Sequence, residues 1–140
     1  MTEPFRVRIE VRGYELDTQG HLRNAVYHEY GDHARWECLR SAGVSIDALL
    51  ATGVGPVTLQ DTIRFHRELR GGDHVHVSCI FVWGAGKTFQ VEQEFRSDDG
   101  TPLATLTSVG GLLDLHRRRL VTDPASHWRS LASSPEILAL

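Results

Sequence analysis

The stretch Tyr14-Glu15-Leu16-Asp17-Thr18-Gln19-Gly20-His21-Leu22-Arg23-Asn24 joins two segments of different periodicity. Apolar and polar residues alternate before it, and apolar residues recur every three or four positions after it. Within the bend, Asp17 and His21 are four positions apart, and Gly20 allows the backbone to turn sharply between them. Because loops between regular elements often carry functional side chains, we predict that this bend is the functional site.

The flanking segments read as a strand and a helix. Residues 5–14 alternate in the manner of a half-buried strand. Asn24 stands where a helix N-cap is expected, and Gly43 follows as a C-terminal glycine. Between them the predicted helix has roughly five turns and one apolar stripe. That stripe consists of Val26, Tyr30, Ala34, Cys38 and Leu39.

The second half of the chain reads as four strands. Turn-forming residues separate them at 70–73, 84–87 and 97–100, and Ser45 is expected to cap a short helical turn before the first. Within that first strand, the apolar residues Val57, Leu59, Ile63, Phe65 and Leu69 are predicted to share one face. The Gly110-Gly111 pair in the last strand indicates a bulge or a close approach by another backbone. We predict a meander of these four strands, the first strand of the chain joining their sheet, and one helix covering a face.

Composition narrows the possible functions. A chain of 140 residues that is 41% hydrophobic is predicted to form one domain, residues 1–140. Its net charge of -3 gives no electrostatic basis for a general nucleic-acid partner. Its apolar runs are too short to span a membrane, and Met1-Thr2-Glu3 does not begin a signal peptide, so a cytoplasmic location is predicted. Cys38 and Cys79 are expected to be reduced, buried residues.

The pattern Asp17-Thr-Gln-Gly20-His21-Leu-Arg-Asn24-Ala-Val-Tyr27-His-Glu-Tyr30, continuing to Ala34-Arg35, resembles the hotdog-fold acyl-CoA thioesterases of the 4-hydroxybenzoyl-CoA thioesterase family. That family has Asp-x-x-Gly-His-x-x-Asn before a tyrosine-bearing helix with a late Ala-Arg. The likeness continues more weakly through residues 65–73 and into the last strand, so it covers most of the chain. It implies an α+β hotdog fold, with a five-stranded curved antiparallel sheet around one long helix. It also implies hydrolysis of an acyl-CoA or acyl-carrier-protein thioester to a free carboxylic acid.

The resemblance assigns roles within the bend. In the family the residue matching Asp17 is the catalytic carboxylate, either as nucleophile or as the base that activates water, and the sequence leaves both open. His21 is implied to line the thioester pocket, and a backbone N–H at Asn24 to polarise the thioester carbonyl. Without the resemblance, Asp17 reads as a loop carboxylate that caps a turn and His21 as a loop histidine.

Substrate-binding residues follow from the same resemblance. Gly20 and Tyr27 are expected beside the acyl pocket, mostly across a subunit boundary. The cations Arg64, Lys87, Arg117 and Arg118 are candidates for binding the phosphates of coenzyme A, against the alternative of a solvated surface. No metal and no cofactor other than coenzyme A, as part of the substrate, are expected, because the eight histidines are scattered and lack metal-ligand spacing.

Three questions remain open in the sequence. A non-catalytic acyl-CoA-binding module and a hotdog hydratase or dehydratase are the alternatives to a hydrolase. Glu37 is an alternative carboxylate, as in a second thioesterase lineage. Asp61 falls on the apolar side of its strand, either as a polar group of the substrate pocket or because the register slips at a bulge.

The exposed edge of a five-stranded sheet predicts a homodimer or homotetramer. The acyl group and the thiol donor are not specified.

Overall fold

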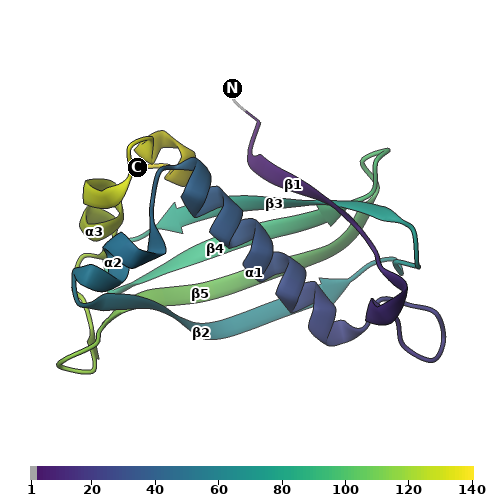
Figure 1. Ribbon diagram of the computed structural model, residues 1–140, viewed down its shortest axis with the longest axis horizontal. Helices are drawn as coiled ribbons and strands as arrows, with labels where there is room; N and C mark the ends of the chain where they lie inside the picture. The colour runs from purple at the N-terminus through teal and green to yellow at the C-terminus, as the bar shows by residue number, and fades with distance from the viewer. Residues whose placement is uncertain (1–2) are drawn as a thin grey trace.

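The computed structural model describes residues 3–140 as a curved antiparallel sheet wrapped around one long helix (Figure 1). The six strands are β1 (Phe5–Glu10), β2 (Val54–Phe65), β3 (His74–Trp83), β4 (Thr88–Arg96), β5 (Pro102–Asp114) and the two-residue β6 (Arg119–Leu120). The helices are α1 (Asn24–Ser41), α2 (Ile46–Ala51) and α3 (Pro124–Leu131), with 3₁₀ turns η1 (Gly13–Glu15) and η2 (Pro135–Leu138). The predicted α+β class and the curved sheet around one long helix are confirmed, with β6 as an addition to the five expected strands.

The order of the strands differs from the predicted meander. The sheet runs β1-β3-β4-β5-β2, and β6 pairs with β5. β1 occupies the free side of β3, with Phe5 opposite Cys79, so β2 has no place there. β2 pairs instead with β5, from Val54 opposite Asp114 at one end. The link 66–73 therefore has to pass two intervening strands and is not the tight connection that was predicted.

β2 contains a bulge that overturns its predicted apolar face. The register against β5 shifts between Thr58 and Gln60, so Leu59 is an extra residue. An inserted residue reverses the alternation, and positions of equal parity before and after it point to opposite faces. The prediction that Val57, Leu59 and Phe65 share one face is therefore wrong. Leu59 is 51% exposed at the edge of the sheet.

The glycine pair of β5 lies opposite this bulge. A Cβ atom on Gly110 would meet the Val57 carbonyl oxygen at 3.2 Å and the Phe89 ring at 3.4 Å. The close backbone approach predicted for these glycines is thus confirmed, and the bulge belongs to the neighbouring strand.

The ends of α1 follow partly from its sequence. Asn24 is the first helical residue rather than the predicted N-cap, since Arg23 takes that position without a side-chain hydrogen bond to the helix. Gly43 follows the helix with a φ of 84°, a left-handed conformation that glycine adopts at low cost. Ser45 caps α2 as predicted, because its hydroxyl accepts from the Ala48 N–H at 3.3 Å.

The first strand is shorter than residues 5–14, because β1 ends at Glu10 and η1 follows. The carboxylate of Glu15, on η1, is nearly buried and accepts from the Tyr30 hydroxyl at 2.6 Å and the Arg12 N–H at 2.9 Å. Burial and this hydrogen bond raise the pKa of Tyr30. The contact fixes the chain against α1 immediately before the Asp17 bend.

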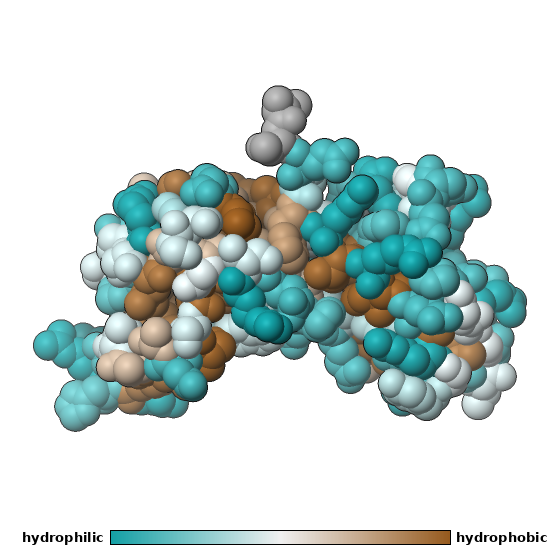
Figure 2. All heavy atoms as spheres, turned by 45° about the horizontal axis from the view of Figure 1, so that its top comes forward, coloured by the Kyte–Doolittle hydropathy of each residue, from teal (hydrophilic) through white to brown (hydrophobic). Residues whose placement is uncertain are grey.

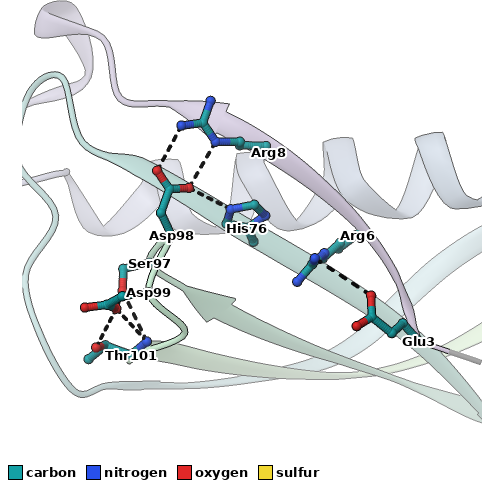
Figure 3. A network of polar contacts seen from close by, with 8 residues as sticks. All are labelled: Glu3, Arg6, Arg8, His76, Ser97, Asp98, Asp99 and Thr101. Carbon is teal, nitrogen blue, oxygen red and sulfur yellow. Dashed lines mark hydrogen bonds and ion pairs between the residues drawn. The ribbon is translucent and has the colours of Figure 1, made fainter.

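A polar network fixes the turn at 97–100 to the edge of the sheet. Figure 3 shows Arg8 of β1 and His76 of β3 converging on Asp98. Arg8 donates to both carboxylate oxygens at 3.0 and 2.9 Å, and His76 Nε2 lies 2.7 Å from Oδ1. The hydrogen bonds from Arg8 and then His76 lower the pKa of Asp98. Because Arg8 and Asp98 are about half exposed, the pair contributes little to stability.

Two apolar clusters fill the space between α1 and the sheet, and a polar layer separates them. The cluster near the start of α1 includes Tyr27 and Phe95, and the cluster near its end includes Phe81, Phe89 and Trp128. Cys38 and Cys79 are buried and free in the second cluster, as predicted. The layer between the clusters includes Gln93, whose side-chain N–H donates to the Gly31 carbonyl at 2.9 Å.

Gly31 sets the distance between α1 and the sheet. A Cβ atom there would meet Leu106 Cδ2 at 2.7 Å and Gln93 Oε1 at 3.0 Å, and both side chains are buried. We expect Gly31→Val to lower the free energy of unfolding by about 1–3 kcal/mol through overpacking. Urea denaturation measures this, with Gly86→Ala as the control because nothing lies within 4 Å of its Cβ position. A Gly31→Val protein as stable as the wild type would contradict this packing.

Within the described residues, no helix combines the length and the apolar character needed to cross a bilayer.

Figure 2 shows brown, apolar residues among teal ones at the end of the molecule that carries α2 and α3. Ile46 and Leu50 of α2 are among the exposed large apolar side chains of that region, at 36% and 46% exposed.

Candidate active site

The Asp17 bend is a small closed loop held to the rest of the fold by backbone hydrogen bonds. The Asp17 N–H donates to the His21 carbonyl at 2.7 Å, and the Gly20 N–H donates to the Asp17 carbonyl at 3.1 Å. Gly20 has a φ of 79°, which explains the glycine at this turn. The N–H of Leu22, a buried residue, then donates to the Leu69 carbonyl at 2.8 Å, which anchors the loop to the link between β2 and β3.

Asp17 presents an ionised carboxylate held by one of its two oxygens. Its Oδ1 accepts from the backbone N–H of Gln19 at 2.9 Å and of His21 at 3.0 Å. These bonds, first the one from His21, lower the pKa of Asp17. Among residues 3–140, Oδ2 accepts no hydrogen bond, so one oxygen is left for chemistry. The interpretation of Asp17 as a turn-capping residue is thus correct and is compatible with a reactive role.

The start of α1 supplies free backbone donors next to this carboxylate. Among the described residues, the N–H groups of Asn24 and Ala25 donate to no acceptor, and the Val26 N–H donates to the Arg23 carbonyl at 3.0 Å. Free N–H groups at a helix N-terminus carry partial positive charge and bind anionic oxygens. The arrangement suits a carbonyl oxygen that develops negative charge.

A cavity of about 270 Å³ joins these groups. Its lining includes Asp17, His21, Asn24 and Tyr27, so four of the predicted site residues come together. Gly20 lies in the loop beside them. Tyr27 is buried, which raises its pKa, and its ring contacts Phe65 edge-on with centroids 5.0 Å apart.

The lining also contains residues that the sequence analysis did not predict as site residues. His66, Arg67 and Glu68 follow β2 and form one side of the cavity, and Glu68 contacts the imidazole of His21. No local motif marks them, because their position depends on β2 lying at the edge beyond β5.

The predicted phosphate-binding cations do not gather at this cavity. Arg64 is exposed on β2, opposite Thr105 and one residue before the lining residue Phe65. Lys87 lies in the β3–β4 turn, and Arg117 and Arg118 lie in the β5–β6 turn. Both turns are at the α2 end of the molecule, whereas residues 17–23 are at the opposite end (Figure 1). Within one chain, therefore, Lys87, Arg117 and Arg118 are remote from Asp17.

A second, largely apolar cavity of about 120 Å³ lies under the C-terminal half of α1. Its apolar lining includes Trp36, Leu39, Phe81, Phe89 and Trp128. Glu37 lines neither this cavity nor the first, and it pairs with Arg40 at 2.8 Å on the helix surface.

A polar network forms the side of this second cavity that faces the first. Ser108 is buried, donates to Asp61 Oδ1 at 2.6 Å and accepts from Arg35 at 2.9 Å. Asp61 Oδ2 lies 3.4 Å from His28 Nδ1, and Arg35 also pairs with Asp32. For Asp61, the sequence had left open a polar pocket residue or a register slip at a bulge. β2 does contain the bulge. Asp61 nevertheless faces the interior of the fold, because it lies opposite the buried Ser108. Among residues 3–140, no group of three or more His, Cys, Asp or Glu side chains could hold a metal ion.

The sequence of this chain is similar to those of known thioesterases. Residues 11–137 match the family model described as the thioesterase-like superfamily. The chain is 40% identical over 127 residues to the chloroplastic acyl-acyl carrier protein thioesterase ATL3 of Arabidopsis thaliana, covering 90% of this chain and 66% of ATL3. It is 33% identical over 63 residues to the long-chain acyl-CoA thioesterase FadM of Escherichia coli, covering 45% of this chain and 47% of FadM.

The fold is shared with solved structures. The 1,4-dihydroxy-2-naphthoyl-CoA thioesterase of Synechocystis superposes with a TM-score of 0.82 at 17% identity, covering 92% of this chain and 95% of that one. At such low identity this likeness concerns the hotdog fold alone. The chain spans about two thirds of ATL3 and less than half of FadM. The family match extends over most of the chain, and the chain therefore belongs to the thioesterase-like superfamily.

Proposed function

We propose that this protein hydrolyses an acyl-CoA or acyl-carrier-protein thioester to a free carboxylic acid and a free thiol. The observation that carries the proposal is the pairing of an ionised Asp17 carboxylate with the free N–H groups at the start of α1, in one cavity. Membership in the thioesterase-like superfamily supports it, and so do the names of ATL3 and FadM.

Asp17 acts on the thioester carbonyl carbon in one of two ways. As a nucleophile, its free Oδ2 attacks that carbon and expels the thiolate, and water then cleaves the resulting anhydride. As a base, it takes a proton from the water that attacks the same carbon. In both routes the carbonyl oxygen becomes an oxyanion, which the Asn24 N–H and its neighbour stabilise. The held Oδ1 keeps Asp17 fixed while Oδ2 reacts.

The complete site is composed of two copies of the chain. β2 is the longer of the two sheet edges, and it leaves Leu59 and Phe65 about half exposed. Antiparallel pairing of β2 with itself, about a two-fold axis, places the α2 end of one copy next to the partner's Asp17. Lys87, Arg117 and Arg118 then come near that carboxylate and can bind phosphates of coenzyme A. Such a dimer brings together residues that are remote from each other within one chain.

The same pairing brings the apolar cavity of one copy near the partner's Asp17, and we assign the acyl group to this cavity. Trp36 forms its outer wall and is 37% exposed. We expect Trp36→Ala to shift the preference toward longer acyl groups, since each buried methylene contributes about 0.8 kcal/mol, or roughly fourfold in kcat/KM. The measurement is kcat/KM against a series of acyl chain lengths, with Ile46→Ala as control. An unchanged preference would remove the acyl group from this cavity.

Two other functions fit the fold, and one set of assays separates them from hydrolysis. A hydratase would add water to an enoyl-CoA without releasing thiol, and a binding module would hold acyl-CoA without turnover. Thiol release, hydration of an enoyl-CoA and equilibrium binding are measured on the same preparation. We expect thiol release that is matched by free acid. Hydration without thiol release, or binding without either, would overturn the proposal in favour of the corresponding alternative.

A further inference from the structure

Glu68 connects the Asp17 loop to the link between β2 and β3. One oxygen of its carboxylate contacts Nε2 of His21, and the other accepts from Nε of Arg70 at 2.9 Å. His21 is the more buried of the two contacting residues, with 29% of its side chain exposed, against 48% for Glu68. Both residues line the cavity that contains Asp17.

Backbone contacts hold the two segments in register, so the contact between His21 and Glu68 does not depend on flexible side chains alone. His21 and Arg70 form an antiparallel bridge, and the Arg70 N–H donates to Asp73 at 2.9 Å. Arg70 Nη1 also lies 3.7 Å from the position of a Cβ on Gly20. The carboxylate of Glu68 is therefore presented to the imidazole by a rigid turn.

This contact determines which ring nitrogen of His21 remains available. A carboxylate accepts hydrogen bonds and donates none, so a hydrogen bond between Nε2 and Glu68 requires the proton to be on Nε2. The other nitrogen, Nδ1, makes no hydrogen bond to any of the residues 3–140. For histidines that ligate a metal, carboxylate partners of this kind fix the tautomer and ring orientation, and their loss costs about 10–100-fold in affinity or activity. We take the same range for His21.

We propose that Glu68 is a positioning residue, which fixes the orientation and tautomer of His21 so that Nδ1 can contact the substrate or the attacking water beside Asp17. The inference rests on the proposed thioester hydrolysis and adds to it a residue that acts through His21. Arg70 in turn orients Glu68. Because Glu68 is about half exposed, its polar contacts contribute little to stability, and replacing it should change the reaction and not the fold.

The test combines kinetics with a double-mutant cycle. We expect Glu68→Leu to lower kcat by about 10–100-fold with KM within about twofold. His21→Asn should have a similar effect, and the double variant should be no worse than either single one, because Glu68 acts only through His21. Glu68→Gln keeps an acceptor oxygen and should recover most of the rate. Glu92→Leu, at an exposed position of β4, is the control. Independent, multiplicative losses in the double variant would overturn the inference.

A spectroscopic readout tests the positioning without turnover. Long-range ¹H–¹⁵N spectra report which imidazole nitrogen of His21 carries the proton. We expect the wild type and Glu68→Gln to show a protonated Nε2, and Glu68→Leu to show a mixture of tautomers. An unchanged tautomer in Glu68→Leu would contradict the role of Glu68 but not the proposed hydrolysis. A wild type that is inactive on every thioester would contradict the proposed function. The spectra would still show whether Glu68 orients His21.

Discussion

Replacing Asp17 by asparagine is expected to lower kcat for thioester hydrolysis by about 10²–10⁴-fold, the range for removal of a positioned acid or base. The amide oxygen of asparagine can still accept from the N–H groups of Gln19 and His21, so the loop should keep its shape. The loss then belongs to the missing negative charge at the reacting oxygen. Thiol release under saturating substrate measures kcat, and the free energy of unfolding, expected to be unchanged, is the control for the fold.

The pH dependence of the wild type gives an internal check on this assignment. The pKa of Asp17 lies below its ordinary value of 3.8, so the carboxylate is ionised at neutral pH. Protonation of Asp17 can lower kcat only as the pH falls toward that value or below it. A fall in rate between pH 5 and pH 7 would therefore report another group. An Asp17→Asn variant with near-normal hydrolysis would exclude Asp17 from catalysis.

A charge at the edge of β2 is expected to abolish activity by separating the two copies. Leu59 is 51% exposed at the middle of this edge, so Leu59→Glu should leave the folded monomer intact. Near a two-fold axis, however, it buries two like charges close together, which costs several kcal/mol at an interface. We expect a monomer whose kcat/KM is at least about 100-fold lower, since misplacing or losing site residues costs that much.

Light scattering gives the mass of the particle, and kcat/KM measured across protein concentrations shows whether activity follows association. Val82→Glu on β3 is the matched control, because that side chain is also exposed but β4 and β5 separate its strand from β2. A wild type that is monomeric and fully active would contradict the two-copy site. So would a Leu59→Glu protein that remains dimeric and active.

The local features of the fold were predictable because they depend on neighbouring residues. The alternation in β3 and β4, the glycine after α1 and the serine cap of α2 each express a short-range preference, and each is confirmed. The start of α1 was misplaced by one residue, since Asn24 has the composition of an N-cap but lies inside the helix.

The order of the strands in the sheet could not be predicted from such short-range preferences. Adjacent strands in the sequence were expected to pair, but β1 takes the side of β3 that β2 would have used. A bulge was only one of two explanations that the sequence left open for Asp61, and the bulge at Leu59 determines which face of β2 carries Phe65 and Asp61. These features depend on contacts between residues far apart in the chain.

The same distinction applies to the candidate site. Asp17, His21 and Asn24 are close in sequence, so one motif predicted that they meet, and they line one cavity. Glu68 arrives from the link after β2 and has no motif of its own. The cations Lys87 and Arg117 lie at the end of the molecule opposite Asp17 within one chain, so their binding of substrate stays a prediction.

We expect this protein to cleave thioesters, and thiol release by the wild type measures that reaction. The panel pairs each acyl group, aromatic or aliphatic, as its CoA and its carrier-protein thioester, with free acid quantified by mass spectrometry. We predict equal amounts of thiol and free acid from at least one member of the panel, with a rate proportional to protein. Neither product from any member, at protein concentrations that bind acyl-CoA, would contradict this expectation.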